Sequence, residues 1–144
     1  MAEKTLPNKI LCVCIENTVR SVMLESLLSK YTKTISAGID VASFSNPIVQ
    51  EVVKANGIDF QIKEPEDIDD IDLDDVDLII TLSEDAYRYI KSKELHKKCE
   101  VEQWVTARPP VLGEVPRQAC FDAYQNIFNE LVKHIENSFE IKVR

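Results

Sequence analysis

The segment CIENTVRS, residues 14–21, contains a cysteine and an arginine separated by five residues, with a serine directly after the arginine. Successive backbone N–H groups in a tight turn form a nest for an anion, and the Arg20 guanidinium would add a planar pair of donors for phosphate oxygens. Such a field favours the thiolate of a cysteine over its thiol, and the thiolate is the nucleophile. The segment therefore predicts an oxyanion site in which Cys14 can attack the bound anion.

Two further side chains in the segment would support this chemistry. Ser21 could donate a hydrogen bond to the Cys14 sulfur, and Asn17 could brace the turn because asparagine tolerates unusual backbone angles. A Cys-x5-Arg pattern is loose on its own, since free cysteines are often buried core residues. Three features of its context favour an oxyanion site: an apolar run before the turn, a helical pattern after it, and a hydroxyl beside the arginine.

The elements around the turn predict the fold. The turn lies between an apolar run at residues 9–15 and apolar residues at helical spacing over residues 20–32. Later strands are expected at 34–39, 76–82 and 99–105, and later helices at 47–57, 83–95 and 117–139. This alternation predicts an α/β fold with a parallel sheet covered on both faces. Ligands bind at the carboxyl ends of the strands in such sheets, which is where CIENTVRS lies.

Length and composition limit the classes of protein that fit. The chain has 144 residues, 44% of them hydrophobic, which suits one domain spanning residues 1–144. Its formal net charge of -8 argues against a protein that binds nucleic acid or an anionic membrane. No apolar run has the length of a membrane span, and the starting segment MAEKTLPNK lacks an apolar signal core. We therefore expect a cytoplasmic protein.

Four cysteines stand at positions 12, 14, 99 and 120. They are too few and too scattered for a disulfide scaffold, so we expect free thiols. Cys12 and Cys14 have no further ligands at a useful spacing, and we expect neither a metal site nor a cofactor. The acidic segment 64–77 is punctuated by apolar residues and predicts a solvated surface that docks on the body. It lacks the glycine and the closing glutamate of a calcium-binding loop.

The segment VCIENTVRS resembles the signature V-C-x-G-N-x-C-R-S of the low-molecular-weight protein tyrosine phosphatases and the related thioredoxin-coupled arsenate reductases. TISAGI, VVKANGID, DLIITLSEDA and VEQWV are similar to further segments of that family, in the same order along nearly the whole chain. The resemblance implies a three-layer α/β/α sandwich around a four-stranded parallel sheet.

The same resemblance implies a role for each residue of the segment. Cys14 would be the nucleophile that forms a phosphocysteine, Arg20 would bind two equatorial oxygens, and Ser21 would stabilise the thiolate. The phosphate-binding loop would comprise Cys14, Ile15, Glu16, Asn17, Thr18, Val19 and Arg20, with backbone N–H groups as donors. Asn17 would hold the shape of the turn.

The sequence departs from the family pattern in four places. Glu16 replaces a glycine of the loop, and Val19 replaces its second cysteine, so that any disulfide protection of Cys14 by that neighbour is lost. Ser83 stands where the arsenate reductases have a resolving cysteine, which disfavours a redox relay. Arg108 stands where the family has the aspartate that protonates the leaving group, and arginine cannot serve as an acid at neutral pH.

The general acid is therefore unknown. General acid catalysis contributes ~10²–10⁴-fold, so its loss predicts a slow enzyme or one limited to good leaving groups. Glu114 and Asp122 are the nearest downstream carboxylates, and Arg108 could instead bind a second anionic group. For Tyr87 and Tyr89 the sequence does not decide between a pocket wall and simple packing.

These observations predict a cytoplasmic phosphatase of the low-molecular-weight type that acts through a phosphocysteine. Its substrate would be phosphotyrosine in a phosphorylated protein, or a small aryl phosphate. The alternative is a non-catalytic relative that binds a phosphorylated partner, which the missing acid and Glu16 favour. Arsenate reduction is a third hypothesis, which Ser83 disfavours. The sequence does not determine the oligomeric state.

Overall fold

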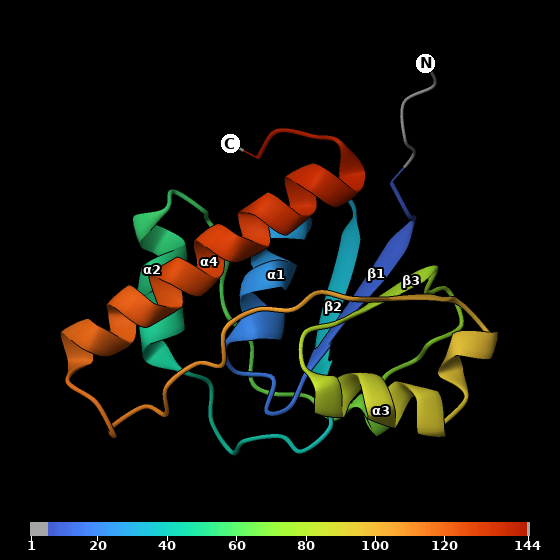
Figure 1. Cartoon of the computed structure of the whole chain (residues 1–144), viewed down its shortest axis with the longest axis horizontal. Helices are drawn as coiled ribbons and strands as arrows, with labels where there is room; N and C mark the ends of the chain where they lie inside the picture. Colours follow the sequence, from blue (N-terminus) through green and yellow to red (C-terminus); the bar gives the residue numbers. More distant parts are fainter. Residues whose placement is uncertain (1–5, 144) are drawn as a thin grey trace.

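The structure is a computed structural model of the chain, and it describes residues 6–143. Strands and helices alternate along these residues (Figure 1). The strands are β1 (Lys9–Cys14), β2 (Lys33–Gly38), β3 (Leu78–Thr81) and β4 (Glu100–Gln103), and the α-helices are α1 (Arg20–Leu28), α2 (Pro47–Ala55), α3 (Glu84–Ser92) and α4 (Arg117–Phe139). Two short 3-10 helices, η1 (Ile68–Asp70) and η2 (Leu95–Lys97), lie in the connections.

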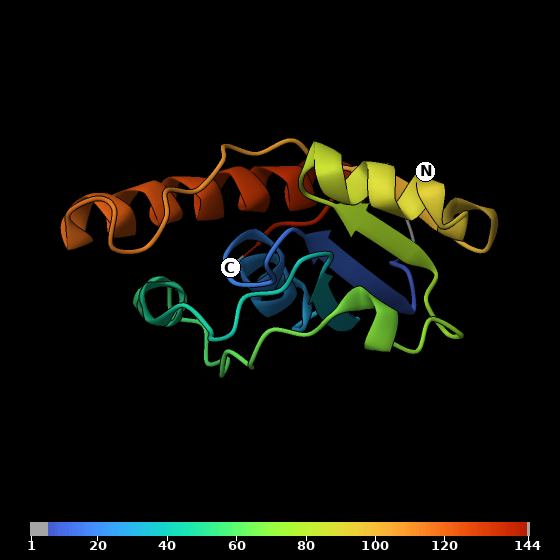
Figure 2. The ribbon, with the colours of Figure 1, turned by 90° about the horizontal axis from the view of Figure 1, so that it is seen from below.

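The four strands form one parallel sheet in the order β2-β1-β3-β4. β1 lies in the interior of the sheet, where Leu11 pairs with Ile35 of β2 and with Ile79 of β3. Because all strands run the same way, their carboxyl ends meet at one edge, which is where ligands bind in such folds. Figure 2 looks onto this edge, where the loop after β1 lies. The predicted parallel sheet is confirmed.

Alternate residues of β1 pack against different layers. Ile10, Cys12 and Cys14 belong to a buried cluster with residues of α1, α2 and α4, whereas Leu11 and Val13 pack with α3 and η1. In Figure 1, α4 lies across α1 and α2 while α3 lies apart from them. This arrangement confirms the three-layer α/β/α sandwich.

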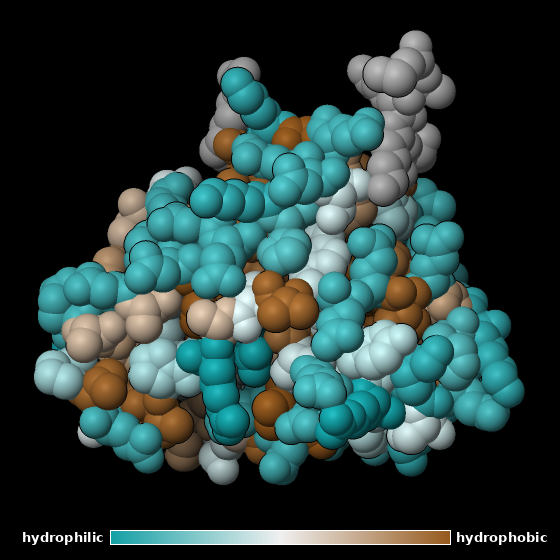
Figure 3. Space-filling model, viewed as in Figure 1, coloured by the Kyte–Doolittle hydropathy of each residue, from teal (hydrophilic) through white to brown (hydrophobic). Residues whose placement is uncertain are grey.

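α4 covers the sheet through one apolar stripe. Its buried residues recur every three or four positions, as in an amphipathic helix, and they are Cys120, Tyr124, Ile127, Phe128, Leu131, Ile135 and Phe139. The outward side of the helix is largely hydrophilic (Figure 3). No helix within residues 6–143 combines the length and the apolar character that a membrane crossing requires.

The acidic segment 64–77 docks on the body of the protein, as predicted. Ile68 and Val76 are buried in the cluster on the α3 side of the sheet. The segment also meets the end of β2, because the Gly38 N–H donates to Glu66 O at 2.9 Å. The chain beyond β2 therefore supports the same edge of the sheet that carries the loop after β1.

The first helix is shorter than predicted, whereas the cap of the third is as predicted. α1 ends at Leu28 and not at residue 32, because Leu28 O accepts the N–H groups of Tyr31 and Thr32 in a turn. Ser83 caps α3, since its Oγ accepts the Ala86 N–H at 3.1 Å.

The end of β2 approaches the loop after β1 backbone to backbone. A Cβ atom on Gly38 would lie 2.6 Å from Ile15 O and 3.0 Å from Asn17 N. Just beyond, the Asp40 N–H donates to Ile15 O at 2.9 Å. A glycine permits this approach because it has no side chain.

We predict that Gly38→Ala destabilises the protein by about 1–3 kcal/mol and weakens phosphate binding, because the new methyl group displaces the loop. Urea denaturation measures the free energy of unfolding, and calorimetry measures the phosphate affinity. Gly57→Ala is the matched control, because Gly57 has a φ of +78° and open space around its Cβ position. That change should destabilise the protein through backbone strain and leave phosphate affinity unchanged. Unchanged phosphate affinity in Gly38→Ala would contradict the prediction.

Candidate active site

The loop of residues 15–19 joins β1 to α1 and leaves the start of the helix open. Val19 precedes α1, and no side chain caps the helix there, whereas Asn46 and Ser83 cap α2 and α3. The first N–H groups of α1 therefore have no side-chain cap, and the helix dipole adds a partial positive charge there. The first turn of α1 also carries no acidic residue. This end of α1 is suited to an anion.

Cys14 lies at the end of β1, and its sulfur has a hydroxyl partner below the loop. The distance between Cys14 Sγ and Ser21 Oγ is 2.8 Å. Asn17 Nδ2 donates to the same serine oxygen at 2.9 Å, and the Ser21 hydroxyl keeps a proton that it can donate to the sulfur. The Ser21 hydroxyl is thus the hydrogen-bond partner of the sulfur within the site. The structure thus brings Cys14, Asn17 and Ser21 together.

Asn17 fixes the shape of the loop. Its φ of 59° lies in the left-handed region, where asparagine is enriched among residues other than glycine. Its buried amide also donates to Ser36 Oγ of β2 at 2.9 Å. Its Oδ1 accepts from the Glu66 N–H at 2.8 Å and from Lys63 Nζ at 3.2 Å. One side chain thereby ties the loop to β2 and to the acidic segment beyond it.

Glu25 of α1 extends this network into the interior. Ser36 Oγ donates to Glu25 Oε1 at 2.5 Å. Burial raises the pKa of the Glu25 carboxyl, and the hydrogen bond from Ser36 and the charge of Lys63 oppose this rise. A chain of hydrogen bonds therefore runs from a buried carboxyl through Ser36 to Asn17 and the loop.

Arg20, the first residue of α1, is held beside Cys14. Only 7% of its surface is exposed, and its Nη1 donates to Leu82 O, just past β3, at 2.9 Å. Burial lowers the pKa of Arg20, the neighbouring Cys14 opposes this shift, and the charge of Arg108 adds to it. Arginine stays protonated in proteins, so a fixed cation faces the loop.

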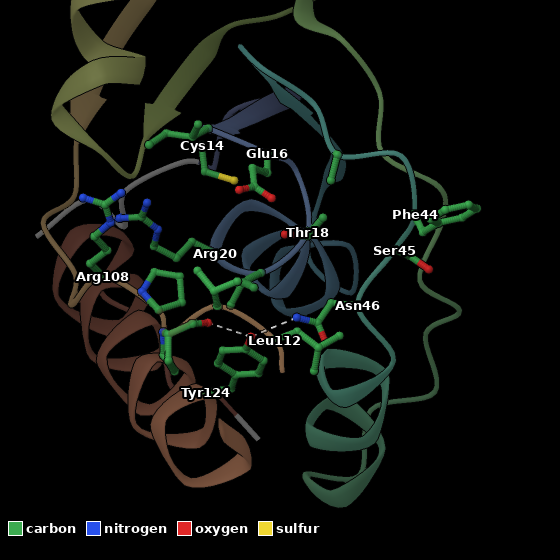
Figure 4. A pocket seen from close by; sticks show the side chains of 16 residues that line it. Cys14, Glu16, Thr18, Arg20, Phe44, Ser45, Asn46, Arg108, Leu112 and Tyr124 are labelled. Atoms are coloured by element: carbon green, nitrogen blue, oxygen red, sulfur yellow. Dashed lines mark hydrogen bonds between the residues drawn. The ribbon is translucent and has the colours of Figure 1, made fainter. Parts of the chain in front are cut away.

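The loop forms the floor of a pocket of about 230 Å³ (Figure 4). One wall follows β2, a second precedes α4, and Tyr124 lies between them. The walls expose apolar side chains, since Phe44 is 79%, Val111 58% and Leu112 45% exposed. Figure 3 shows hydrophobic side chains gathered over the segment that precedes α4. The pocket therefore combines a polar floor with an apolar rim.

Six of the seven residues predicted for the loop line this pocket: Cys14, Ile15, Glu16, Thr18, Val19 and Arg20. The seventh, Asn17, is buried behind the loop together with Ser21 and acts on it through hydrogen bonds. The side chain of Glu16 is exposed and lines the pocket, and in the view of Figure 4 its carboxylate lies next to the Cys14 sulfur. A negative charge on Glu16 therefore opposes an anion on the floor, and the water around this exposed side chain weakens the repulsion.

Arg108 lies at the mouth of the pocket, where the family pattern implies an acid. Its exposed guanidinium lies beside that of Arg20 (Figure 4), which agrees with the effect of its charge on the Arg20 pKa. Glu114 and Asp122, the carboxylates considered as substitute acids, do not line the pocket. The pocket mouth thus carries a second cation.

The remaining thiols lie elsewhere. Cys12 and Cys120 are buried in the core, and Cys99 is half-buried on the α3 side of the sheet. Burial raises the thiol pKa of Cys12 and of Cys99, which makes both poor nucleophiles. Of the cysteines in residues 6–143, only Cys14 lines the pocket.

Sequence reasoning missed the residues that hold the walls in place. Tyr124 OH donates to Pro110 O at 3.0 Å and accepts from Asn46 Nδ2 at 2.9 Å, so it joins α4, α2 and the segment before α4 (Figure 4). In the sequence, Tyr124 is one more member of an apolar stripe, and only its hydroxyl signals a second role. Tyr87 and Tyr89, considered as walls, do not line the pocket.

Comparison with known proteins places this chain among relatives. A profile of the family described as low molecular weight phosphotyrosine protein phosphatase matches residues 9–141. A YwlE mutant from Bacillus subtilis has a similar structure, with a TM-score of 0.74 and 18% identity over 92% of this chain and 96% of the other. An arsenate reductase from Archaeoglobus fulgidus has a TM-score of 0.66 and 25% identity, over 92% of this chain and 99% of the other. Vibrio vulnificus Wzb in complex with benzylphosphonate has a TM-score of 0.68 and 21% identity, over 90% of this chain and 98% of the other. No curated protein matches the chain.

The raised pKa of Glu25 predicts how stability changes with pH. This pKa lies above the ordinary value of 4.5, so the folded protein holds the proton more tightly than the unfolded chain does. The contribution of Glu25 to stability is therefore largest below that value and is lost as pH rises through the folded-state pKa. Glu25→Gln keeps an oxygen acceptor for Ser36 and cannot ionise. We expect the free energy of unfolding of this variant, relative to wild type, to increase with pH in urea denaturation. A pH-independent difference would count against the prediction.

Proposed function

Because the chain belongs to the low-molecular-weight phosphotyrosine protein phosphatase family, we propose that it transfers a phosphoryl group first to Cys14 and then to water. Its proposed substrates are phosphotyrosine in a protein or small aryl phosphates. The observation that carries the proposal is the 2.8 Å contact of Cys14 Sγ with Ser21 Oγ, beside the buried Arg20. These groups are a nucleophile, a donor that stabilises it, and a cation for the transferred group.

The reaction has two displacements at phosphorus. The Cys14 thiolate attacks, the S–P bond forms, and the P–O bond to the leaving group breaks with its electron pair on oxygen. Arg20 and the N–H groups of the loop bind the equatorial oxygens, whose charge grows during transfer. Water then attacks phosphorus, the S–P bond breaks, and the electron pair returns to the sulfur, to which Ser21 donates. The protons of the water leave with phosphate or pass to solvent.

The pocket supports an aromatic substrate. Phe44, Val111 and Leu112 expose apolar surface around the polar floor. An aromatic ring that covers this surface would gain affinity from the apolar area removed from water. The relative Wzb from Vibrio vulnificus was solved with benzylphosphonate, which joins an aromatic ring to a phosphonate.

A second candidate function is binding of a phosphorylated partner without turnover. The observation that favours it is Arg108 at the pocket mouth, since loss of a general acid removes ~10²–10⁴-fold in rate. Arsenate reduction has less support, because Ser83 caps α3 and Cys14 is the one pocket thiol in residues 6–143. Whether the protein hydrolyses phosphate esters or only binds a phosphorylated partner, we place it in the cytoplasm, where free thiols such as Cys14 stay reduced.

We predict that the wild-type protein hydrolyses p-nitrophenyl phosphate and that Cys14→Ser does not. The leaving group of this ester departs readily, so turnover should survive the absence of a general acid. Absorbance of the released p-nitrophenolate measures the rate. Cys99→Ser, which alters a thiol outside the pocket, is the control and should retain wild-type turnover. An inactive wild type that binds vanadate tightly would refute the catalytic proposal and support the binding function.

We also predict that Arg20→Ala abolishes measurable phosphate binding in calorimetry. Arg20→Lys should weaken it by ~10–100-fold, because lysine keeps the charge and loses the planar pair of donors. Arg117→Ala is the matched control, because Arg117 is an exposed arginine paired with Glu51 outside the pocket. If Arg20→Ala binds phosphate as tightly as wild type, the assignment of the site is wrong.

A further inference from the structure

We propose that Arg108 stabilises the leaving group as an anion, so that this protein favours activated substrates, namely acyl phosphates and aryl phosphates of acidic phenols. The inference rests on the proposed function and narrows its substrate class. In this proposal Arg108 pairs with the departing oxygen as an anion, where the family has an acid that protonates it.

Arg108 carries a charge that no neighbour in the described chain neutralises. Each of the other arginines in residues 6–143 has a partner, which is a backbone carbonyl for Arg20 and a glutamate for both Arg88 and Arg117. Arg108 has no hydrogen bond or ion pair within residues 6–143, although the chain has a net charge of -8. An unpaired cation at a pocket on an acidic protein is available to an anionic ligand.

The segment that carries Arg108 is held in place on both sides of it. Before it, His134 Nε2 lies 3.0 Å from Val105 O. After it, Tyr124 OH donates to Pro110 O at 3.0 Å. Both partners belong to α4, so a helix of the core fixes the backbone that presents the guanidinium. The backbone of this segment is thus fixed near the pocket, while the exposed Arg108 side chain can move to meet an anion there.

Arg108 faces the same space as the nucleophile. It lines the pocket together with Cys14 and Arg20, and it shares an adjoining pocket with Arg20. The two guanidinium groups lie side by side in Figure 4. A phosphoryl group held by the loop would send its leaving group away from Cys14, because attack and departure are in line. That direction leads out of the loop toward the mouth, where Arg108 stands.

The other ionisable groups around the mouth are limited in what they can donate. The Tyr124 hydroxyl already donates to Pro110 O, and burial raises its pKa well above the ordinary value. Within residues 6–143, Glu16 is the one carboxylate that lines this pocket, while Glu84 and Asp85 line the adjoining one. Glu16 is therefore the rival proton donor that an experiment has to exclude.

The proposed step needs no proton for the leaving group. The Cys14 sulfur forms its bond to phosphorus while the bond from phosphorus to the leaving oxygen breaks, and both electrons of that bond stay on the oxygen. The oxygen departs as a carboxylate or phenolate paired with the Arg108 guanidinium, which keeps its own protons. Leaving groups that are already stable as anions are favoured for this reason.

The test is a leaving-group series that runs from acetyl phosphate and dinitrophenyl phosphate to unsubstituted phenyl phosphate. We expect wild-type kcat/KM to fall steeply as the leaving group becomes more basic. Arg108→Ala should lower kcat/KM by ~10²-fold, most strongly for the basic phenols, because more charge develops on their oxygen. Arg108→Lys should recover part of this loss. Arg108→Asp should flatten the dependence, because a carboxyl can donate a proton.

Two outcomes would overturn the inference. A shallow dependence in wild type that becomes steep in Glu16→Gln would identify Glu16 as the acid. Equal kcat/KM for wild type and Arg108→Ala across the series would leave Arg108 without a role. Either result spares the proposed function as long as Cys14→Ser is inactive on every substrate, whereas turnover by Cys14→Ser refutes that function itself. Arg117→Ala removes an exposed positive charge outside the pocket and should match wild type.

Discussion

The left-handed turn at Asn17 is the constraint on which the site depends. A residue other than glycine is strained in this conformation, and its surroundings must hold it there. The Asn17 amide meets this demand with hydrogen bonds to α1, to β2 and to the acidic segment. Gly38 leaves the space in which β2 and the loop approach each other. The loop after β1 is therefore shaped by the sheet beside it.

The pocket above that loop is divided by polarity. Arg20 and Arg108 form a cationic side, and Phe44, Val111 and Leu112 form an apolar rim. A strongly acidic chain thus concentrates two positive charges at one small opening. The local field at the opening can attract an anion even though the protein as a whole repels one. Under the proposed function, the apolar rim would distinguish substrates by the group attached to the phosphate.

Features that depend on neighbours in sequence could be predicted, and features that depend on distant contacts could not. The apolar run of β1 and the period of α4 identify both elements, and the spacing from Cys14 to Ser21 identifies the loop. Tyr124 was indistinguishable from its apolar neighbours, because its partners Asn46 and Pro110 are supplied by other parts of the fold. The end of α1 was misplaced because it is set by a hydrogen-bonded turn and not by apolar spacing.

The hydrogen bond from Tyr124 to Pro110 attaches the wall that precedes α4 to that helix. Tyr124 belongs to the buried stripe of that helix, so its hydrogen bond to Pro110 ties the wall to a residue of the core. Core helices open with free energies that approach that of global unfolding, whereas loops open more easily. The wall near Pro110 is therefore anchored to the core, whereas the apolar rim residues Phe44, Val111 and Leu112 project into solvent.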